Sequence, residues 1–228
     1  LSVPFSPRPA TPPMATMRAV FKDTFFYQLY FQTAGVAEAE FERDLRVALR
    51  KFLYLGSGEA DLSDVQPKAP DADLLSDLPD PAQLPDWLTE ADLDFYVGEF
   101  TRSGMRGPLN YYRNHDLTWA LTAGAPQTIA QPAMFVAGAK DGVILMAAEA
   151  LKQLPTRVPN LLINELIPGI GHWTQQEAPA RLFRQQPVVQ RRADIADVKV
   201  AGGRRREAGD DGHFRPLARI SFLCECQR

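Results

Sequence analysis

The sequence predicts an α/β fold in which a helical region precedes strands of a parallel sheet. Residues 15–125 are patterned as helices and loops. Residues 130–180 instead hold two short apolar runs, 133–137 and 161–166, separated by an amphipathic segment at 143–154. Helices followed by a strand–helix–strand unit are typical of a lid inserted before the last strands of an α/β sheet.

Length and composition describe an ordinary globular chain. The 228 residues are enough to bury one core, or one domain and a lid, and 45% of them are hydrophobic and 23% charged. Because no run of 18 apolar residues occurs, we expect no transmembrane helix. The sequence starts at Leu1, without an initiator methionine or the basic segment of a signal peptide. We therefore expect it to continue a longer protein.

The last 48 residues differ from the rest. Residues 1–180 carry an excess of acidic side chains, whereas residues 181–228 carry an excess of basic ones without a period. This tail lacks interleaved aromatic residues and zinc-ligand spacing, so we expect no nucleic-acid partner. Its composition predicts disorder. We favour a frame-shifted translation of a different ending as the origin of this tail, because a helix that the fold needs is interrupted within its pattern.

The two cysteines, Cys224 and Cys226, both lie in this tail. Their spacing is too tight for an ordinary disulfide, and no nearby histidines or further cysteines complete a zinc site. The sequence therefore predicts no metal and a reducing, cytoplasmic location.

The lid region has local signals for its elements. Five prolines make residues 1–14 an extended connector, and residues 36–53 form a strongly amphipathic helix. Residues 59–85 are polar, acidic and rich in proline, which predicts a long solvated loop. A capping box predicts a helix over residues 89–104, and Gly107 begins another.

Two residues follow the apolar runs and suggest chemistry. Asp141 comes just after the first run, and His172 lies in a glycine-bracketed loop, Gly169-Ile170-Gly171-His172, after the second. An acid after one parallel strand and a histidine after the next is the order that α/β-hydrolases use for the last two triad members. That order requires an upstream nucleophile, which we do not find in these residues.

Three motifs resemble soluble epoxide hydrolases of the α/β-hydrolase fold. They are the aromatic run 25–32 with residues 35–40, the segment 103–114, and the histidine loop with Gly171-His172-Trp173-Thr174-Gln175. They occur in the family's order across residues 1 to about 180. The resemblance implies an incomplete α/β-hydrolase sheet, with its last strands and a helical lid but without its first half. The implied divisions are a connector at 1–14, a lid at 15–127, a core part at 128–180 and the tail at 181–228.

The resemblance also assigns roles to individual residues. Tyr27 and Tyr112 match the two lid tyrosines that hold the epoxide oxygen, His172 matches the general base, and Asp141 matches the acid that orients it. The positions similar to pocket-lining ones are Phe25, Gln28, Val143 and Trp173. The implied partners are a small hydrophobic epoxide and water, with no cofactor and no membrane. A homodimer is compatible with the resemblance, which does not fix the oligomeric state.

The residue types suit this chemistry. Ring opening leaves an alkoxide, and a phenol with a pKa of about 10 stays protonated at neutral pH yet can donate to that oxygen. Two phenols on one atom form an oxyanion-type clamp, in which one such donor is worth about 3–4 kcal/mol. The family's nucleophile is an aspartate that forms an ester with the substrate, and the histidine would activate the water that hydrolyses it.

Several alternatives remain open at this stage. Taken alone, either tyrosine reads as a core residue and Asp141 as a helix cap, while His115 and His213 read as surface residues. The nucleophile elbow is missing, because Gly56-Ser57-Gly58 lacks a leading glycine and Asp86 lies in a loop. We therefore expect an epoxide hydrolase whose activity these 228 residues do not supply alone. A dehalogenase or esterase of the same fold, and a non-catalytic remnant or binding module, are the alternatives.

Overall fold

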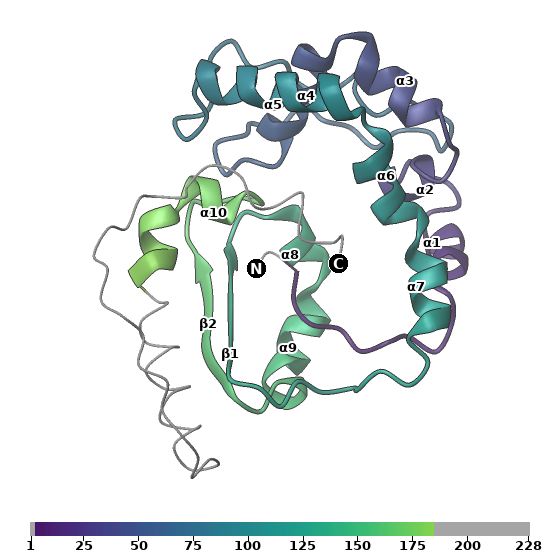
Figure 1. Ribbon diagram of the computed structural model, residues 1–228, viewed down its shortest axis with the longest axis vertical. Coiled ribbons are helices and arrows are strands. Elements are labelled where there is room, and N and C mark those ends of the chain that lie inside the picture. The colour runs from purple at the N-terminus through teal and green to yellow at the C-terminus, as the bar shows by residue number, and fades with distance from the viewer. Residues whose placement is uncertain (1–2, 185–228) are drawn as a thin grey trace.

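The fold consists of a small parallel sheet and an arc of helices. The computed structural model describes residues 3–184 (Figure 1). The helices α1 to α7 form the arc, and the strands β1 and β2 lie on its inner side together with α8, α9 and α10 (Thr174–Glu177) (Figure 1). No helix within the described range is long and apolar enough to cross a membrane.

The sheet matches the predicted strand–helix–strand unit. Strands β1 (Ala133–Gly138) and β2 (Leu161–Ile167) are parallel, and α8 (Gly142–Met146) and α9 (Ala148–Arg157) form the crossover between them. The amphipathic segment 143–154 is thus two helices rather than one. Parallel strands require such a crossover, because the chain must return to the same end of the sheet.

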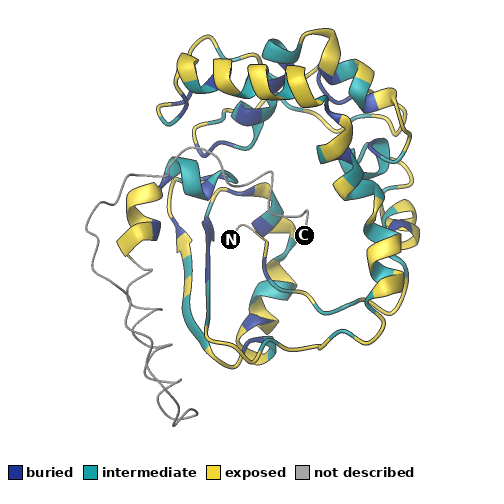
Figure 2. Ribbon diagram, in the orientation of Figure 1, coloured by how far each residue is buried: buried dark blue, intermediate teal, exposed yellow. Residues whose placement is uncertain are grey.

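Strand β1 is buried on both faces. Phe135 and Ala137 pack with apolar residues of the crossover, whereas Val136 packs with Ile167 and Leu182 on the other face. A strand covered on both sides reads as a continuous apolar run, which explains why the sequence signal was clear. Figure 2 shows the contrast with α5 (Glu90–Ser103) and α7 (His115–Leu121), which are exposed over most of their length.

The arc contains seven helices among the described residues. Their bounds are α1 Pro13–Val20, α2 Tyr27–Tyr30, α3 Val36–Arg43, α4 Leu45–Leu55, α5 Glu90–Ser103, α6 Arg106–Arg113 and α7 His115–Leu121. The predicted capping box of α5 is confirmed, because Thr89 and Asp92 bond reciprocally, and Gly104 ends the helix at φ 72°. The single helix predicted over 36–53 is wrong. Asp44 leaves helical geometry and caps α4 instead, since its side chain accepts a hydrogen bond from the Val47 amide.

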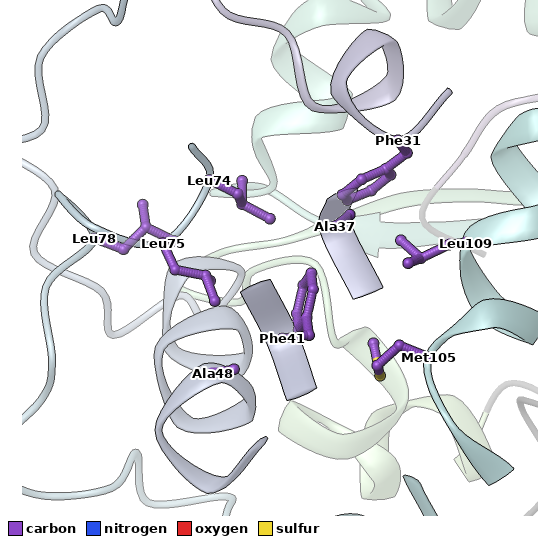
Figure 3. Packing of buried hydrophobic residues seen from close by; sticks show 9 residues of the cluster. All are labelled: Phe31, Ala37, Phe41, Ala48, Leu74, Leu75, Leu78, Met105 and Leu109. Carbon is purple, nitrogen blue, oxygen red and sulfur yellow. The ribbon is translucent and has the colours of Figure 1, made fainter. Parts of the chain in front are cut away.

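The lid has its own apolar core (Figure 3). Its buried residues are Phe31, Ala37, Phe41, Ala48, Leu74, Leu75, Leu78, Met105 and Leu109. Residues 59–85 hold no helix or strand, as predicted, but the expectation of a fully solvated loop is wrong because three of its leucines are buried here. The Glu40 carboxylate accepts hydrogen bonds from the Leu74 and Leu75 amides and so holds this loop on the core.

Two predicted boundaries shift. Helix α1 begins at Pro13, so the connector is shorter than residues 1–14, because proline is well accommodated in a first helical turn. Residues 179–184 are helical and Leu182 is buried, so the first residues of the predicted tail belong to the fold. Residues 185–228 lie outside the described range.

Candidate active site

Asp141 and His172 are brought together at the ends of the two strands. Asp141 follows β1 and is 1% exposed, and its Oδ1 accepts a hydrogen bond from the Val143 amide at the start of α8. Its Oδ2 lies 2.9 Å from Nδ1 of His172, which follows β2. An ionised carboxylate can only accept, so we assign the proton of this bond to Nδ1. The lone pair of the imidazole then lies on Nε2, where it can act as a base.

The histidine loop, residues 168–173, is fixed by its backbone. Gly169 has a φ of 79°, which favours glycine, and the His172 amide donates to the Gly56 carbonyl at 2.6 Å. Trp173 lies with its ring 5.0 Å from the imidazole, and its Nε1 donates to the Leu53 carbonyl at 2.6 Å. This packing anchors Trp173 to the end of α4.

The two lid tyrosines also meet. Tyr27 begins α2 and Tyr112 lies near the end of α6, and their rings are 5.7 Å apart in an edge-to-face arrangement. Burial, with a smaller contribution from Tyr27, raises the pKa of Tyr112 to about 12. Burial also raises the pKa of Tyr27, and the negative charge of Asp141 adds to this effect. Both phenols therefore stay protonated at neutral pH, and Tyr27 lies within electrostatic reach of the acid.

The positions resembling pocket-lining ones divide into two groups. Phe25 and Gln28 belong to the lid: Phe25 packs on the same lid core as the two tyrosines, and Gln28 Nε2 donates to the Tyr27 hydroxyl at 2.8 Å. The Oε1 atom of Gln28 is buried and has no hydrogen-bond partner among the described residues. Val143 instead lies beside Asp141 at the start of α8 and is half-buried.

An ion pair lies next to Tyr112. The Arg113 guanidinium binds Glu38 through both carboxylate oxygens, at 2.6 and 2.8 Å, and its Nε donates to the Phe31 carbonyl at 2.7 Å. This bidentate geometry connects α6 with α2 and α3. The arginine beside one tyrosine thus fixes the backbone that carries the other.

Sequence reasoning missed two features of this region. His115 is half-buried with its ring 5.9 Å from that of Tyr112, so the expectation of a surface residue is wrong, and burial lowers its pKa. Glu177 accepts hydrogen bonds from Gly58, Gly171 and Trp173. The only local sequence signal for this role of Glu177 was its position one helical turn after the histidine loop.

A helical lid, a parallel strand pair and an acid and histidine at the ends of those strands define a partial α/β-hydrolase. Known proteins agree. The chain is 41% identical over 190 residues to epoxide hydrolase A of Mycobacterium tuberculosis, covering 80% of this chain and 57% of that protein. It is 35% identical to bifunctional epoxide hydrolase 2 of Mus musculus, covering 80% of this chain and 32% of that protein.

Solved structures give the same result. An epoxide hydrolase from an endophytic Streptomyces superposes with a TM-score of 0.76 at 39% identity, over 86% of this chain and 60% of that one. Epoxide hydrolase A from Mycobacterium thermoresistibile gives a TM-score of 0.73 at 38% identity, over 82% of this chain and 58% of that one. No protein-family profile matches the chain. Over about 80% of its length the chain is similar to epoxide hydrolases of the α/β-hydrolase fold, and it spans less than two thirds of the relatives it matches.

Proposed function

We propose that the protein to which this chain belongs hydrolyses an epoxide to a vicinal diol through an ester on an aspartate. That aspartate would lie outside the 228 residues given. The observation that carries the proposal is the combination of the Asp141–His172 pair at 2.9 Å with two tyrosines whose rings are 5.7 Å apart. One pair suits base catalysis and the other suits donation to a developing alkoxide.

Ring opening would use the tyrosines. The aspartate carboxylate attacks one ring carbon, a new C–O ester bond forms, and the C–O bond of the epoxide breaks. The electron pair of the broken bond stays on the epoxide oxygen, which accepts hydrogen bonds from Tyr27 and Tyr112. This oxygen takes the proton of one of the two phenols, which becomes a tyrosinate. The raised pKa of both phenols keeps them in the protonated form that this step needs.

Ester hydrolysis would use the histidine. Nε2 of His172 removes a proton from water, and the resulting hydroxide attacks the ester carbonyl. The ester C–O bond at that carbonyl breaks, and the leaving alkoxide takes the proton of the new carboxyl group, which gives the diol and the ionised aspartate. Asp141 stabilises the imidazolium that forms, because its buried carboxylate faces Nδ1. The proton held by the His172 imidazolium then passes to the tyrosinate, which restores the histidine and the tyrosine.

The aromatic surroundings of the tyrosine pair support a small hydrophobic epoxide as the substrate. Phe31 is buried with its ring 5.1 Å from that of Tyr112, and Phe25 packs on the same cluster.

The sequence pattern of the two cysteines supports a cytoplasmic location.

The test separates the two steps in the complete protein, with the upstream half restored. Intact-protein mass spectrometry after mixing with a styrene-type epoxide detects the ester as added substrate mass. We expect His172→Gln to accumulate the ester, and the double change Tyr27→Phe with Tyr112→Phe to form almost none. Tyr111→Phe is the matched control, because Tyr111 is 65% exposed. Rapid ester formation by the double variant, without accumulation in His172→Gln, would refute the assignment.

A further inference from the structure

We propose that Glu177 is a positioning residue that clamps the histidine loop to the lid and so sets the position of His172. The proposal rests on the function proposed above. It concerns the carboxylate of α10 (Thr174–Glu177), the histidine loop at 168–173, and the residues 56–58 after α4, which we call the lid turn.

One carboxylate connects the two segments. Oε2 of Glu177 accepts hydrogen bonds from the Gly58 amide of the lid turn at 2.8 Å and from the Gly171 amide of the histidine loop at 2.9 Å. Oε1 accepts a third bond, from the Trp173 amide at 3.0 Å. The Gly171 and Trp173 amides flank His172 on both sides along the chain. Bonds to an ionised carboxylate are stronger than bonds between neutral groups, so this set fixes the backbone on either side of the imidazole.

The lid turn and the histidine loop are in direct backbone contact, so neither segment can move towards the other. A Cβ added at Gly58 would lie 2.0 Å from the Gly169 carbonyl oxygen, and one at Gly171 would lie 2.3 Å from the Gly56 carbonyl oxygen. The direct bond from the His172 amide to Gly56 closes the same contact. A displacement of the lid turn would therefore be transmitted to the histidine.

The acid is tied to the same point. Lys140 precedes Asp141, and its Nζ donates to the Gly58 carbonyl at 2.7 Å. The lid turn thus receives contacts from the loops that carry both members of the acid–histidine pair. We infer that this junction keeps the pair aligned with the tyrosines, which are carried by the lid.

The change Glu177→Gln tests the clamp with little change of shape. An amide offers one acceptor oxygen, and its NH₂ group would face an amide donor, so at most two of the three bonds survive. Because His172 acts only after the ester has formed, we expect ester hydrolysis to slow by about 10- to 100-fold, as for a misplaced catalytic group. Ester formation should stay within about 2-fold of the unchanged protein.

The matched control is Glu149→Gln, because Glu149 is exposed and bonds to Lys152 and Gln153 on its own helix, α9. Single-turnover kinetics of the complete protein measures both steps. If both steps slow equally in Glu177→Gln, or if ester hydrolysis keeps its rate, the positioning role is wrong. If this variant does not fold, Glu177→Asp keeps both oxygens on a shorter stem and should show the same selective slowing to a smaller degree. Equal slowing of both steps in that variant would also overturn the proposal.

Amide hydrogen exchange gives a readout that does not depend on epoxide chemistry. Glu177→Gln should speed exchange at Gly58, Gly171 and Trp173, whereas Glu149→Gln should not. Unchanged exchange at these amides would overturn the clamp even in a protein without epoxide turnover. A complete protein that shows the exchange effect but no turnover would instead refute the proposed function alone.

Discussion

The ion pair between Glu38 and Arg113 gives the sharpest stability prediction. The two side chains are 13% and 12% exposed, and they bond through both carboxylate oxygens. Glu38 also accepts from the Gly35 amide at the start of α3, so its charge serves the helix terminus as well. The change Glu38→Gln removes this charge while keeping the shape of the side chain.

The magnitude follows from the pKa of Glu38. The bonds to Arg113 lower that pKa from 4.5 to about 2. At about 1.4 kcal/mol per pKa unit, such a difference corresponds to roughly 3 kcal/mol, and solvent screening reduces it to about 2 kcal/mol. Because the folded-state pKa is depressed, the stabilisation is present above pH 4.5 and is lost as the pH falls towards 2.

Urea unfolding of the chain at several pH values measures this contribution. At pH 7 the Glu38→Gln variant should be less stable by about 2 kcal/mol, and the difference should shrink by more than half at about pH 3. Glu99→Gln is the control, because its partner Arg102 is 72% exposed and such surface pairs contribute little. A difference that stays constant between these pH values, or that is absent at pH 7, would refute the electrostatic reasoning.

Three further outcomes can be measured. Gly58→Ala should destabilise the fold by at least about 2 kcal/mol, because its Cβ would overlap backbone, whereas Gly98→Ala in open space on α5 should stabilise it by about 0.5–1 kcal/mol in thermal unfolding. In the complete protein, Asp141→Asn should slow ester hydrolysis by about 10⁴-fold through misorientation of His172, and a loss below tenfold in stopped-flow measurements would contradict this. Tyrosinate absorbance should show that Tyr112 ionises only near pH 12. The free energy of unfolding should therefore fall between about pH 10 and 12, and Tyr112→Phe should remove both the absorbance change of Tyr112 and its share of this fall.

Local signals in the sequence were sufficient to predict a helix whose ends are fixed by bonds between neighbouring residues. The helix α5 was predicted with its capping box and terminal glycine, because those bonds join residues three or four positions apart. The break at Asp44 was missed, since the apolar spacing continues through it and only the capping bond to Val47 marks the second helix. The burial of leucines within residues 59–85 was missed because it depends on a distant contact. The Leu74 and Leu75 amides bond to the Glu40 carboxylate, which is more than 30 positions away in the sequence.

The candidate site divides in the same way. Strand ends placed Asp141 and His172 at one edge of the sheet, because carboxyl ends of parallel strands lie together, and the structure brings them to hydrogen-bond distance. The Glu177 clamp could not be predicted from pattern, since its bond to Gly58 spans 119 positions. Only the packed structure shows that Gly58 and Gly171 approach other backbone atoms too closely for a Cβ.

The contact between Tyr27 and Tyr112 depends on residues from more than one of the lid motifs. Tyr27 and Tyr112 belong to helices far apart in the sequence, and each alone is compatible with a core role. Arg113 follows Tyr112 directly and bonds both the Phe31 carbonyl after α2 and the Glu38 carboxylate of α3. It therefore fixes α6 against the segment that carries Tyr27. The Arg113–Glu38 ion pair therefore holds the two tyrosines next to each other. Because this ion pair is lost when Glu38 is protonated, we expect the arrangement of the tyrosines to weaken as the pH falls towards the pKa of Glu38.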